Sequence, residues 1–487
     1  MAVVKLSTPG VYVQEIPSLP PSVAEVATAI PAFVGYTEKA DKIASGDLLL
    51  VPTKISGMAE FITLYGGPPT ETADSIKIGV TDAGGSQYSI KFDYDDTKRS
   101  PFRLYYSLQS FFDNGGGTCF IVAAGNYATT DGPVTISSDD LTAGLTKAKD
   151  VDEITLLVIP EMAATGSAAN YKKVVQAMIS QAADPDLRDR FAIIDPYQVT
   201  PLSKTYTDGD LDTDIQFIRD ATVGPESDRY AAAYYPSVVS AYAHRYDFDN
   251  LTIDSYSLAT GATASLTIAA GDKMSKFSGS VFYNKVKDAL NNEWVVLPPS
   301  GAVAGVYTRV DTTKGVWKAP ANEAVLSVVS PVINLSSRQQ EDLNVDPVSG
   351  KSVNVIRSFP GFGTLVWGAR TLNGNDNEWR YISVRRFFIM VEESIKKSIQ
   401  WAVFEPNAIS TWVKVSAMIE NYLYTKWREG ALAGAKPDQA YYVHVGLGST
   451  MNATDVLEGR MNVEIGMAVV RPAEFIVLQF TQMVQQS

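Results

Sequence analysis

The run Thr118-Cys119-Phe120-Ile121-Val122-Ala123-Ala124 opens the part of the sequence that decides the fold class. It is short and apolar, as the buried strands of parallel sheets are. Similar runs follow at 154–159, 191–194 and 231–235. Helical periodicity fills the gaps, and it is clearest in Tyr171, Val174, Val175, Met178 and Ile179. This alternation of strand and helix predicts a small parallel α/β sheet between 118 and 236.

Other patterns surround this α/β segment. From 251 to 322 the chain is rich in Thr, Ser, Gly and Val, and runs such as 264–269 and 293–297 predict β-structure with loops. Two apolar stripes predict helices at 379–401 and 410–429, the second ending at Gly430. Strands are predicted at 441–445 and 461–470. With 487 residues, the chain is long enough for two or three domains.

Both ends of the chain carry apolar strands that lack a local partner. The first, 11–16, is followed by Pro17, Pro20 and Pro21, which favour an extended linker over an immediate hairpin return. The last, 475–480, follows Arg471-Pro472. Each strand needs a sheet edge to complete. The pattern alone leaves open whether that edge lies in the same chain or in another molecule.

The composition excludes several classes of function. With 45% hydrophobic and 20% charged residues the chain is typical of globular proteins, and no apolar run or basic leader predicts a membrane span or a secretion signal. A net charge of −13 argues against nucleic acid as the main partner. The single cysteine, Cys119, excludes an internal disulfide and is expected to be a small buried hydrophobe.

Charge is distributed unevenly along the chain. Residues 137–250 contain 19 acidic and 10 basic side chains, whereas 350–436 contain 12 basic and 7 acidic ones. The basic segment could face an acidic partner, and a chance bias of solvated faces explains the same counts.

No group of residues indicates catalysis. The two histidines are His244 and His444, and neither lies near a G-x-S-x-G turn. Gly350-Lys351-Ser352 imitates the end of a phosphate-binding loop, but Val345 occupies the place of the first glycine, so a turn is favoured.

Two further motifs have ordinary structural explanations. Asn114-Gly115-Gly116-Gly117 precedes a strand and opens no helix, which favours a tight turn over an anion site. The acidic run at Asp208, Asp210, Asp212 and Asp214 lacks the glycine and closing Glu of a calcium loop, so a solvated loop and helix start are expected. We therefore expect no catalytic residue, no cofactor and no metal.

Several motifs resemble those of the contractile tail sheath proteins of myophage tails, phage-tail-like bacteriocins and extracellular contractile injection systems. Near the start they are 8–15 (TPGVYVQE), 32–35 (AFVG) and 111–117 (FFDNGGG). In the second half they are 296–301 (VLPPSG), 304–307 (AGVY), 315–322 (GVWKAPAN), 354–357 (NVIR), 367–371 (WGART), 385–395 (RRFFIMVEESI), 401–407 (WAVFEPN) and 471–475 (RPAEF). Segments 71–100 and 245–292 look like local elaborations.

The resemblance implies a multidomain fold of α+β and α/β type. An inner α+β domain would be built from both chain ends with exchanged terminal β-strands, and an outer α/β domain would be inserted into it. The implied boundaries are 1–22 for the N-terminal strand arm and linker, 23–115 and 351–470 for the inner domain, 116–350 for the outer domain with a β-rich insertion at about 245–292, and 471–487 for the C-terminal strand arm.

The resemblance also implies a function. The chain would be a structural sheath subunit that polymerises helically around a rigid inner tube and contracts to drive the tube through a target envelope. Its partners would be further copies of itself, the inner tube protein, and baseplate and terminator or cap proteins, with no nucleic acid and no direct membrane insertion. It would be made in the bacterial cytoplasm and assembled into a phage tail, a bacteriocin or an injection system, which the residues do not distinguish.

The alternative from another class is a hydrolase or nucleotide-binding enzyme that uses the α/β domain. Such an enzyme would need a glycine-rich turn between strand and helix, and the sequence has none. Electron microscopy would separate the two, because a sheath protein would form striated hollow tubes.

Two sets of residues are predicted to make the assembly contacts. The inter-subunit strand arms are predicted at Val11, Tyr12, Val13, Ile16, Phe475, Ile476, Val477, Leu478 and Phe480. The basic residues that could face the tube are Arg385, Arg386, Lys396 and Lys397. For the basic set, a role in stabilising the surface explains the sequence equally well.

Overall fold

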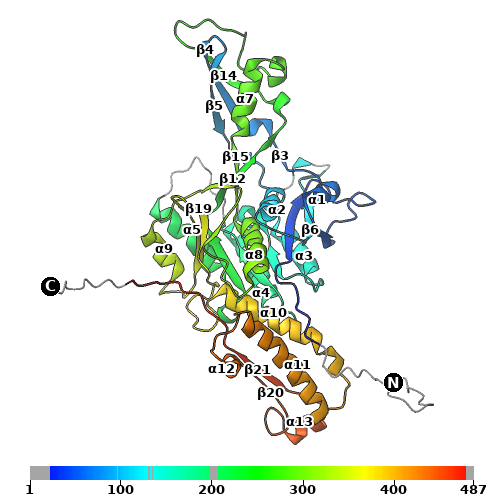
Figure 1. Cartoon of the computed structure of the whole chain (residues 1–487). Coiled ribbons are helices and arrows are strands. Elements are labelled where there is room, and N and C mark those ends of the chain that lie inside the picture. Colours follow the sequence, from blue (N-terminus) through cyan, green and yellow to red (C-terminus); the bar gives the residue numbers. More distant parts are fainter. Residues whose placement is uncertain (1–21, 96, 130–131, 134, 198–206, 479–487) are drawn as a thin grey trace, which may run out of the picture. The chain divides into compact units, whose positions relative to one another are not determined.

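The strands expected between 118 and 236 lie at the centre of a nine-stranded sheet in the computed structural model of the chain (Figure 1). The structure describes residues 22–95, 97–129, 132–133, 135–197 and 207–478. The strand order is β16-β19-β18-β11-β10-β9-β1-β6-β2. The bounds are β1 Pro31–Thr37, β2 Thr53–Ile55, β6 Cys119–Asn126, β9 Leu156–Val158, β10 Phe191–Ile194, β11 Ala231–Tyr235, β16 Glu323–Ala324, β18 Val353–Phe359 and β19 Gly363–Trp367.

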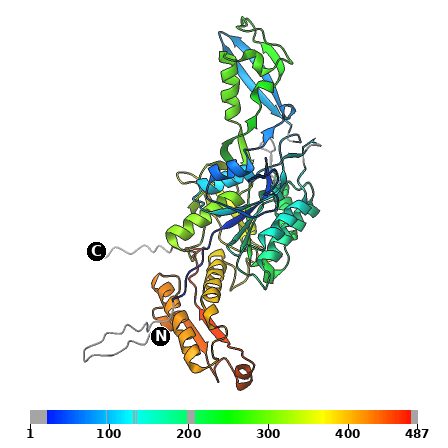
Figure 2. The ribbon, with the colours of Figure 1, turned by 90° about the vertical axis from the view of Figure 1, so that its right-hand side faces the viewer.

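Six neighbouring strands of this sheet, from β6 to β18, run parallel, which confirms the predicted parallel arrangement. Two pairs of helices cover opposite faces of the sheet (Figure 2). They are α2 Leu104–Asp113 with α8 Ser300–Lys314, and α3 Ser138–Ala148 with α4 Ala168–Ala182. Because helices shield both faces, the strands consist almost wholly of buried apolar residues, and Cys119 is buried among them as predicted.

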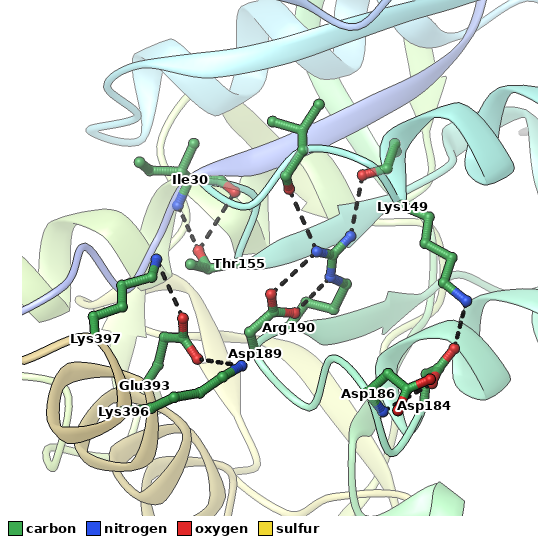
Figure 3. A network of polar contacts seen from close by, with 12 residues as sticks. Ile30, Lys149, Thr155, Asp184, Asp186, Asp189, Arg190, Glu393, Lys396 and Lys397 are labelled. Carbon is green, nitrogen blue, oxygen red and sulfur yellow. Dashed lines mark hydrogen bonds and ion pairs between the residues drawn. The ribbon is translucent and has the colours of Figure 1, made fainter. Parts of the chain in front are cut away.

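A buried arginine supports the edge of this sheet from which β10 starts. Arg190 is fully buried and pairs with Asp189 at 2.7 Å. Its guanidinium also donates to the carbonyl oxygens of Ala148 at 3.1 Å and Val151 at 3.4 Å (Figure 3). These contacts satisfy carbonyls at the C-terminal end of α3, which have no partners within the helix.

The chain divides into two units, and the division differs from the predicted domain boundaries. The larger unit comprises 27–390 and 471–487, and the smaller unit comprises 1–26 and 391–470. The predicted boundaries at 115 and 350 fall inside the large sheet, because β1 pairs with β6 and β9 while β18 pairs with β11. A parallel strand buried on both faces needs a neighbour on each side, so these strands cannot belong to separate domains. Which unit has an inner position stays a prediction.

The two segments 71–100 and 245–292, predicted as local elaborations, combine into one lobe of the larger unit. Strands β4 Ile76–Gly84 and β5 Gln87–Tyr94 form a hairpin, and β14 Ile253–Leu258 pairs in parallel with β4 (Figure 1). Helix α7 Val281–Asn291 packs Phe282, Val286 and Leu290 into a core that both segments share. The lobe therefore needs both segments in order to fold.

The prediction of β-structure with loops for 251–322 was partly wrong. Residues 264–269 form no strand, and the segment contains the helices α7 and α8. Helix α8 is buried on nearly all sides and is built from small residues such as Gly301, Ala302 and Ala304, so it has no polar stripe that would mark a helix. The run at 293–297 does form a strand, β15 Trp294–Leu297, in a sheet with β12 Val238–Ala243 and β17 Val328–Pro331.

The predicted C-terminal helices and strands are present. They are α10 Ile382–Ser398, α11 Ile409–Arg428, β20 Tyr441–Val445 and β21 Val463–Met467. Helix α10 is shorter than predicted because Arg370 and Tyr381 form an antiparallel bridge just before it. In the smaller unit, β20 and β21 form an antiparallel pair, and α11 packs against β20. The remaining bounds are α1 Met58–Tyr65, β3 Thr70–Glu71, β7 Ala128–Thr129, β8 Gly132–Pro133, α5 Asp208–Asp220, α6 Pro225–Asp228, β13 Arg245–Tyr246, α9 Ser337–Asn344, α12 Pro437–Ala440 and α13 Ala453–Leu457.

Candidate functional site

The C-terminal apolar segment is exposed in the single chain. Its residues Phe475, Ile476, Val477 and Leu478 are 74%, 77%, 81% and 71% exposed. None of these four residues lies in a strand. Exposed apolar runs of this length are typical of interaction surfaces. The remaining predicted arm residues, Val11, Tyr12, Val13, Ile16 and Phe480, lie outside the described residues.

The residue directly before this segment is held firmly. The Arg370 guanidinium donates to both carboxylate oxygens of Glu474, with its Nε at 3.0 Å from Oε1 and its Nη2 at 2.6 Å from Oε2. The hydroxyl of Tyr381 donates to the same carboxylate at 3.3 Å. The two charged side chains are 4% and 14% exposed. Within 471–478, the side-chain contact with the rest of the chain is therefore at Glu474, and the apolar run that follows it is exposed.

The N-terminal segment is held where its described part begins, within the smaller unit. The backbone N–H groups of Ala24 and Val26 donate to the hydroxyls of Ser398 and Ser394, each at 3.1 Å. Between them, Glu25 pairs with Lys426 at 2.5 Å. We call the place where a terminal segment bonds to a folded unit its root. The N-terminal root is 24–26, and the C-terminal root is Glu474.

The sheet of β20 and β21 is a candidate acceptor for an added strand. It contains two strands in the described part of the chain, so each strand has one edge without a neighbouring strand. One face packs toward α11, and the other carries Tyr442, His444 and Glu464, with the Tyr442 ring lying over Gly466. A two-stranded sheet is only marginally stable by itself, and additional strands would stabilise it.

The four basic residues predicted to face a tube fall into two groups. Arg385 and Arg386 are buried, at 2% and 4% exposure, which argues against both as tube contacts. Arg386 pairs with Asp311 at 2.6 Å, and the Arg385 guanidinium lies 4.4 Å from the Trp379 ring centre. A helix that packs on two sides can bury arginines where a carboxylate or an aromatic ring receives them, which the charge pattern did not reveal.

Lys396 and Lys397 do lie at the surface. Their side chains are 62% and 36% exposed, and both ammonium groups approach Glu393, at 3.4 and 3.2 Å (Figure 3). An ion pair whose lysine is this exposed contributes about 0–1 kcal/mol to stability.

The polar residues that could have suggested an enzyme are engaged in structural contacts. Buried His244 hydrogen-bonds through Nδ1 to Glu71 at 2.9 Å, and burial lowers its pKa although the carboxylate opposes this. The Lys351 ammonium donates to the carbonyl of Arg219 at 2.7 Å. Asn114 holds the backbone of Leu326, as a structural turn residue would. The acidic run begins α5, where Thr207 and Asp210 form a capping box, so the predicted helix start is confirmed.

Two buried carboxylates at the carboxyl edge of the large sheet were missed in the sequence. Glu161 follows β9 and accepts from the N–H groups of Arg103 and Leu104 at the start of α2, and Asp195 follows β10 and accepts from Ser300 at the start of α8. Burial raises the pKa of Glu161 to about 7 and that of Asp195 to about 8. Ligands usually bind at this edge in α/β proteins. Here both carboxylates instead accept hydrogen bonds from the N-terminal ends of helices.

Two features are absent from the described residues. Across 22–478 with its gaps, no three His, Cys, Asp or Glu side chains are grouped so that they could hold a metal ion. In the same residues no helix has both the length and the apolarity to cross a membrane.

The described residues form a mixed α/β multidomain fold in which the polar groups named above make structural contacts. Residues 374–483 match the family model described as the phage tail sheath C-terminal domain. A tail sheath protein of Vibrio phage KVP40 is 26% identical over 147 residues, which are 29% of this chain and 20% of that protein. The chain thus spans about one fifth of the length of that curated relative.

Solved structures resemble this chain over nearly its full length. The helical sheath of the anti-feeding prophage in its contracted state is 30% identical, with 98% of this chain and 99% of that chain covered and a TM-score of 0.63. The sheath complex of PVC, an extracellular contractile injection system, in its contracted state is 30% identical, with 98% of each chain covered and a TM-score of 0.61. A chain in the baseplate structure of the anti-feeding prophage is also 30% identical, with a TM-score of 0.62.

The chain belongs to the contractile tail sheath proteins, and it is a structural sheath subunit. The comparisons give no support to a hydrolase or nucleotide-binding enzyme.

Proposed function

We propose that this subunit polymerises helically by donating its terminal arms to the β20–β21 sheets of neighbouring copies, around an inner tube, and that the polymer contracts to drive the tube through a target envelope. The observation that carries this proposal is the exposed run Phe475–Leu478 directly after the firmly held Glu474. An exposed apolar segment can be completed by pairing as a strand with a sheet edge, and the β20–β21 sheet offers two edges.

The strength of one donated arm fits a polymer that must rearrange. Each main-chain hydrogen bond of an added strand contributes about 0.5–1.5 kcal/mol net, and burial of a large apolar side chain adds about 1.5–3 kcal/mol. One arm is therefore worth several kcal/mol, and each subunit is held by more than one. A head-to-tail contact of this kind need not close into a ring, so it produces an open helical polymer.

The remaining roles extend this proposal. The smaller unit takes the inner position, where exposed Lys396 and Lys397 face an acidic tube surface. Baseplate and terminator or cap proteins bind the two ends of the polymer. The subunit is made in the bacterial cytoplasm, joins a phage tail or a related injection particle, and acts without catalysis of its own.

Paired substitutions test the donated strand. In a strand, Phe475 and Val477 point to one face and Ile476 and Leu478 to the other. Aspartate at one pair should abolish polymers while aspartate at the other pair weakens them less, because only one face of the acceptor sheet packs on α11. Striated tubes are scored by electron microscopy of the purified full chain. Normal tubes from a chain that lacks Phe475–Ser487 would refute arm donation.

A charge reversal tests the tube contact separately. Replacing Lys396 and Lys397 by Glu should leave sheath polymers intact and abolish their attachment to the tube, measured by sedimentation of sheath together with tube. Unchanged attachment would remove these two lysines from the interface.

A further inference from the structure

Arg370, which receives the Glu474 carboxylate, is itself held in place by the large sheet. Arg370 follows β19, and the side chain of Asn354 on β18 holds its backbone, because Asn354 Oδ1 accepts from the Arg370 N–H and Nδ2 donates to the Arg370 carbonyl, both at 2.8 Å. The same Nδ2 donates to the carbonyl of Ala233 on β11 at 3.1 Å. Gly368 permits this approach, since a Cβ there would stand 2.7 Å from Asn354 Oδ1. The arginine is thus fixed to two strands of the large sheet.

The Arg370 guanidinium has one further fixed contact and presents its remaining donors to Glu474. Its Nη1 donates to the carbonyl of Gly374 at 2.9 Å, while Nε and Nη2 form the fork that receives the carboxylate. Two parallel charge-assisted hydrogen bonds define direction as well as distance. The pair is nearly excluded from water, at 4% and 14% side-chain exposure, so solvent screens it little.

Within its segment, Glu474 is the residue that attaches to the larger unit through its side chain. Among the described residues 471–478, its side chain is the one with a hydrogen bond or ion pair to the rest of the chain, whereas Arg471 and Ala473 are exposed. The last backbone hydrogen bond before it runs from the Val470 N–H to the Ala431 carbonyl at 3.1 Å. Two motifs about a hundred residues apart in sequence, WGART and RPAEF, therefore meet at one ion pair.

We propose that Arg370 and Glu474 form an anchor that fixes where the C-terminal arm leaves the larger unit, so that the part donated to a neighbouring copy begins at Phe475. This inference rests on the arm donation proposed above. Without the anchor the free tether begins at Arg471, which adds four residues, or about 13 Å of extended chain. A slack tether lowers the effective concentration of the arm at its acceptor and transmits movement between subunits less directly.

The anchor is tested in the full chain by a spin label at the root. Ala473→Cys places a nitroxide next to Glu474, and labelling is selective because Cys119 is fully buried. The label should be immobile in the otherwise unchanged protein and mobile in Glu474→Gln and Arg370→Lys, which each remove the two-pronged pair. Glu474→Asp keeps the charge and should be intermediate. Asp74→Asn, which removes the exposed pair with Lys98, is the matched control and should leave the label immobile.

Polymer formation is measured with the same variants, without the label. We expect Glu474→Gln and Arg370→Lys to raise the critical concentration for polymers about tenfold, which corresponds to about 1.4 kcal/mol per contact. The thermal midpoint of the monomer should stay within about 2 °C of the parent protein, because the anchor holds an otherwise exposed segment. A role confined to stability would instead lower that midpoint and leave the critical concentration of the folded fraction unchanged, which would overturn the inference.

Two other results separate this inference from the proposed function. An immobile label in Glu474→Gln would overturn the anchor whatever the arm does, and a mobile label with an unchanged critical concentration would overturn its role in assembly. If deletion of Phe475–Ser487 leaves polymers normal, arm donation fails, while the label still reports whether Arg370 holds the segment.

Discussion

Removal of the Asp311 carboxylate should destabilise the larger unit severely, because it leaves a buried cation without its partner. Arg386 donates to Asp311 through Nη1 at 3.0 Å and Nη2 at 2.6 Å, and it also donates to the Thr28 carbonyl at 2.8 Å. The two charged side chains are 3% and 6% exposed. Breaking a buried pair from one side costs about 3–5 kcal/mol, so Asp311→Ala should raise the unfolding equilibrium constant by about two to four decades.

The loss of stability in Asp311→Ala is large because the Arg386 charge stays buried without a partner. A double substitution that removes both charges tests this explanation. Arg386→Met with Asp311→Leu removes both charges and should be far less costly than either single change. It is not free of cost, since the Thr28 hydroxyl, which donates to Asp311 at 2.6 Å, loses an acceptor worth about 1 kcal/mol.

Urea denaturation followed by far-ultraviolet circular dichroism measures these free energies, with Lys396→Glu as the surface control. The exposed lysine should change the free energy of unfolding by less than about 1 kcal/mol. If Asp311→Ala costs no more than this control, the pair is not the buried support described above. Loss of tube attachment in an Arg386→Met protein of unchanged stability would restore Arg386 as a partner contact.

Three further substitutions probe other parts of the fold. Burial raises the pKa of Asp195 to about 8, so between about pH 4 and 8 the folded state holds a proton that the unfolded chain releases; stability should fall as the pH rises through this range, and Asp195→Asn should flatten the profile of thermal midpoint against pH. Gly301→Ala would place a Cβ 2.3 Å from the Ser107 carbonyl oxygen, so it should force α2 and α8 apart and cost about 1–3 kcal/mol in urea denaturation. Phe282→Ala should remove about 3–5 kcal/mol from the separate core of the lobe, and hydrogen exchange should then accelerate in β4, β5 and β14 and not in the large sheet.

The local sequence pattern was sufficient to predict strands that are apolar throughout and helices with one apolar stripe. The strands at 119–126, 191–194 and 231–235 and the helices at 168–182 and 409–428 lie close to their predicted positions, because continuous apolar runs and clear stripes carry that information. The lobe was not predictable in the same way. Its core combines residues near 78 with residues near 282, and periodicity within either segment says nothing about pairing across two hundred residues.

In the candidate site, too, local pattern predicted one part and did not predict another. The arm at 475–480 was predicted because an apolar run at a chain end has no local partner, and its role stays a prediction. Its anchor was not visible, since Arg370 and Glu474 are single charged residues whose ordinary position is the solvent. The burial of Arg386 was missed for the same reason. A charged residue in a sequence motif reveals its partner only when the fold brings the two together.

The two chain ends differ in how firmly their roots are held, and this difference follows from exposure. Glu474 is 14% exposed and meets a two-pronged guanidinium, whereas Glu25 is 42% exposed and meets the single ammonium of Lys426. A guanidinium fork fixes both direction and distance, while an ammonium acts as a point charge that tolerates rotation. Solvent also screens the exposed pair more strongly. We therefore expect the C-terminal root to hold its direction, and the N-terminal root to yield first, if neighbouring copies move.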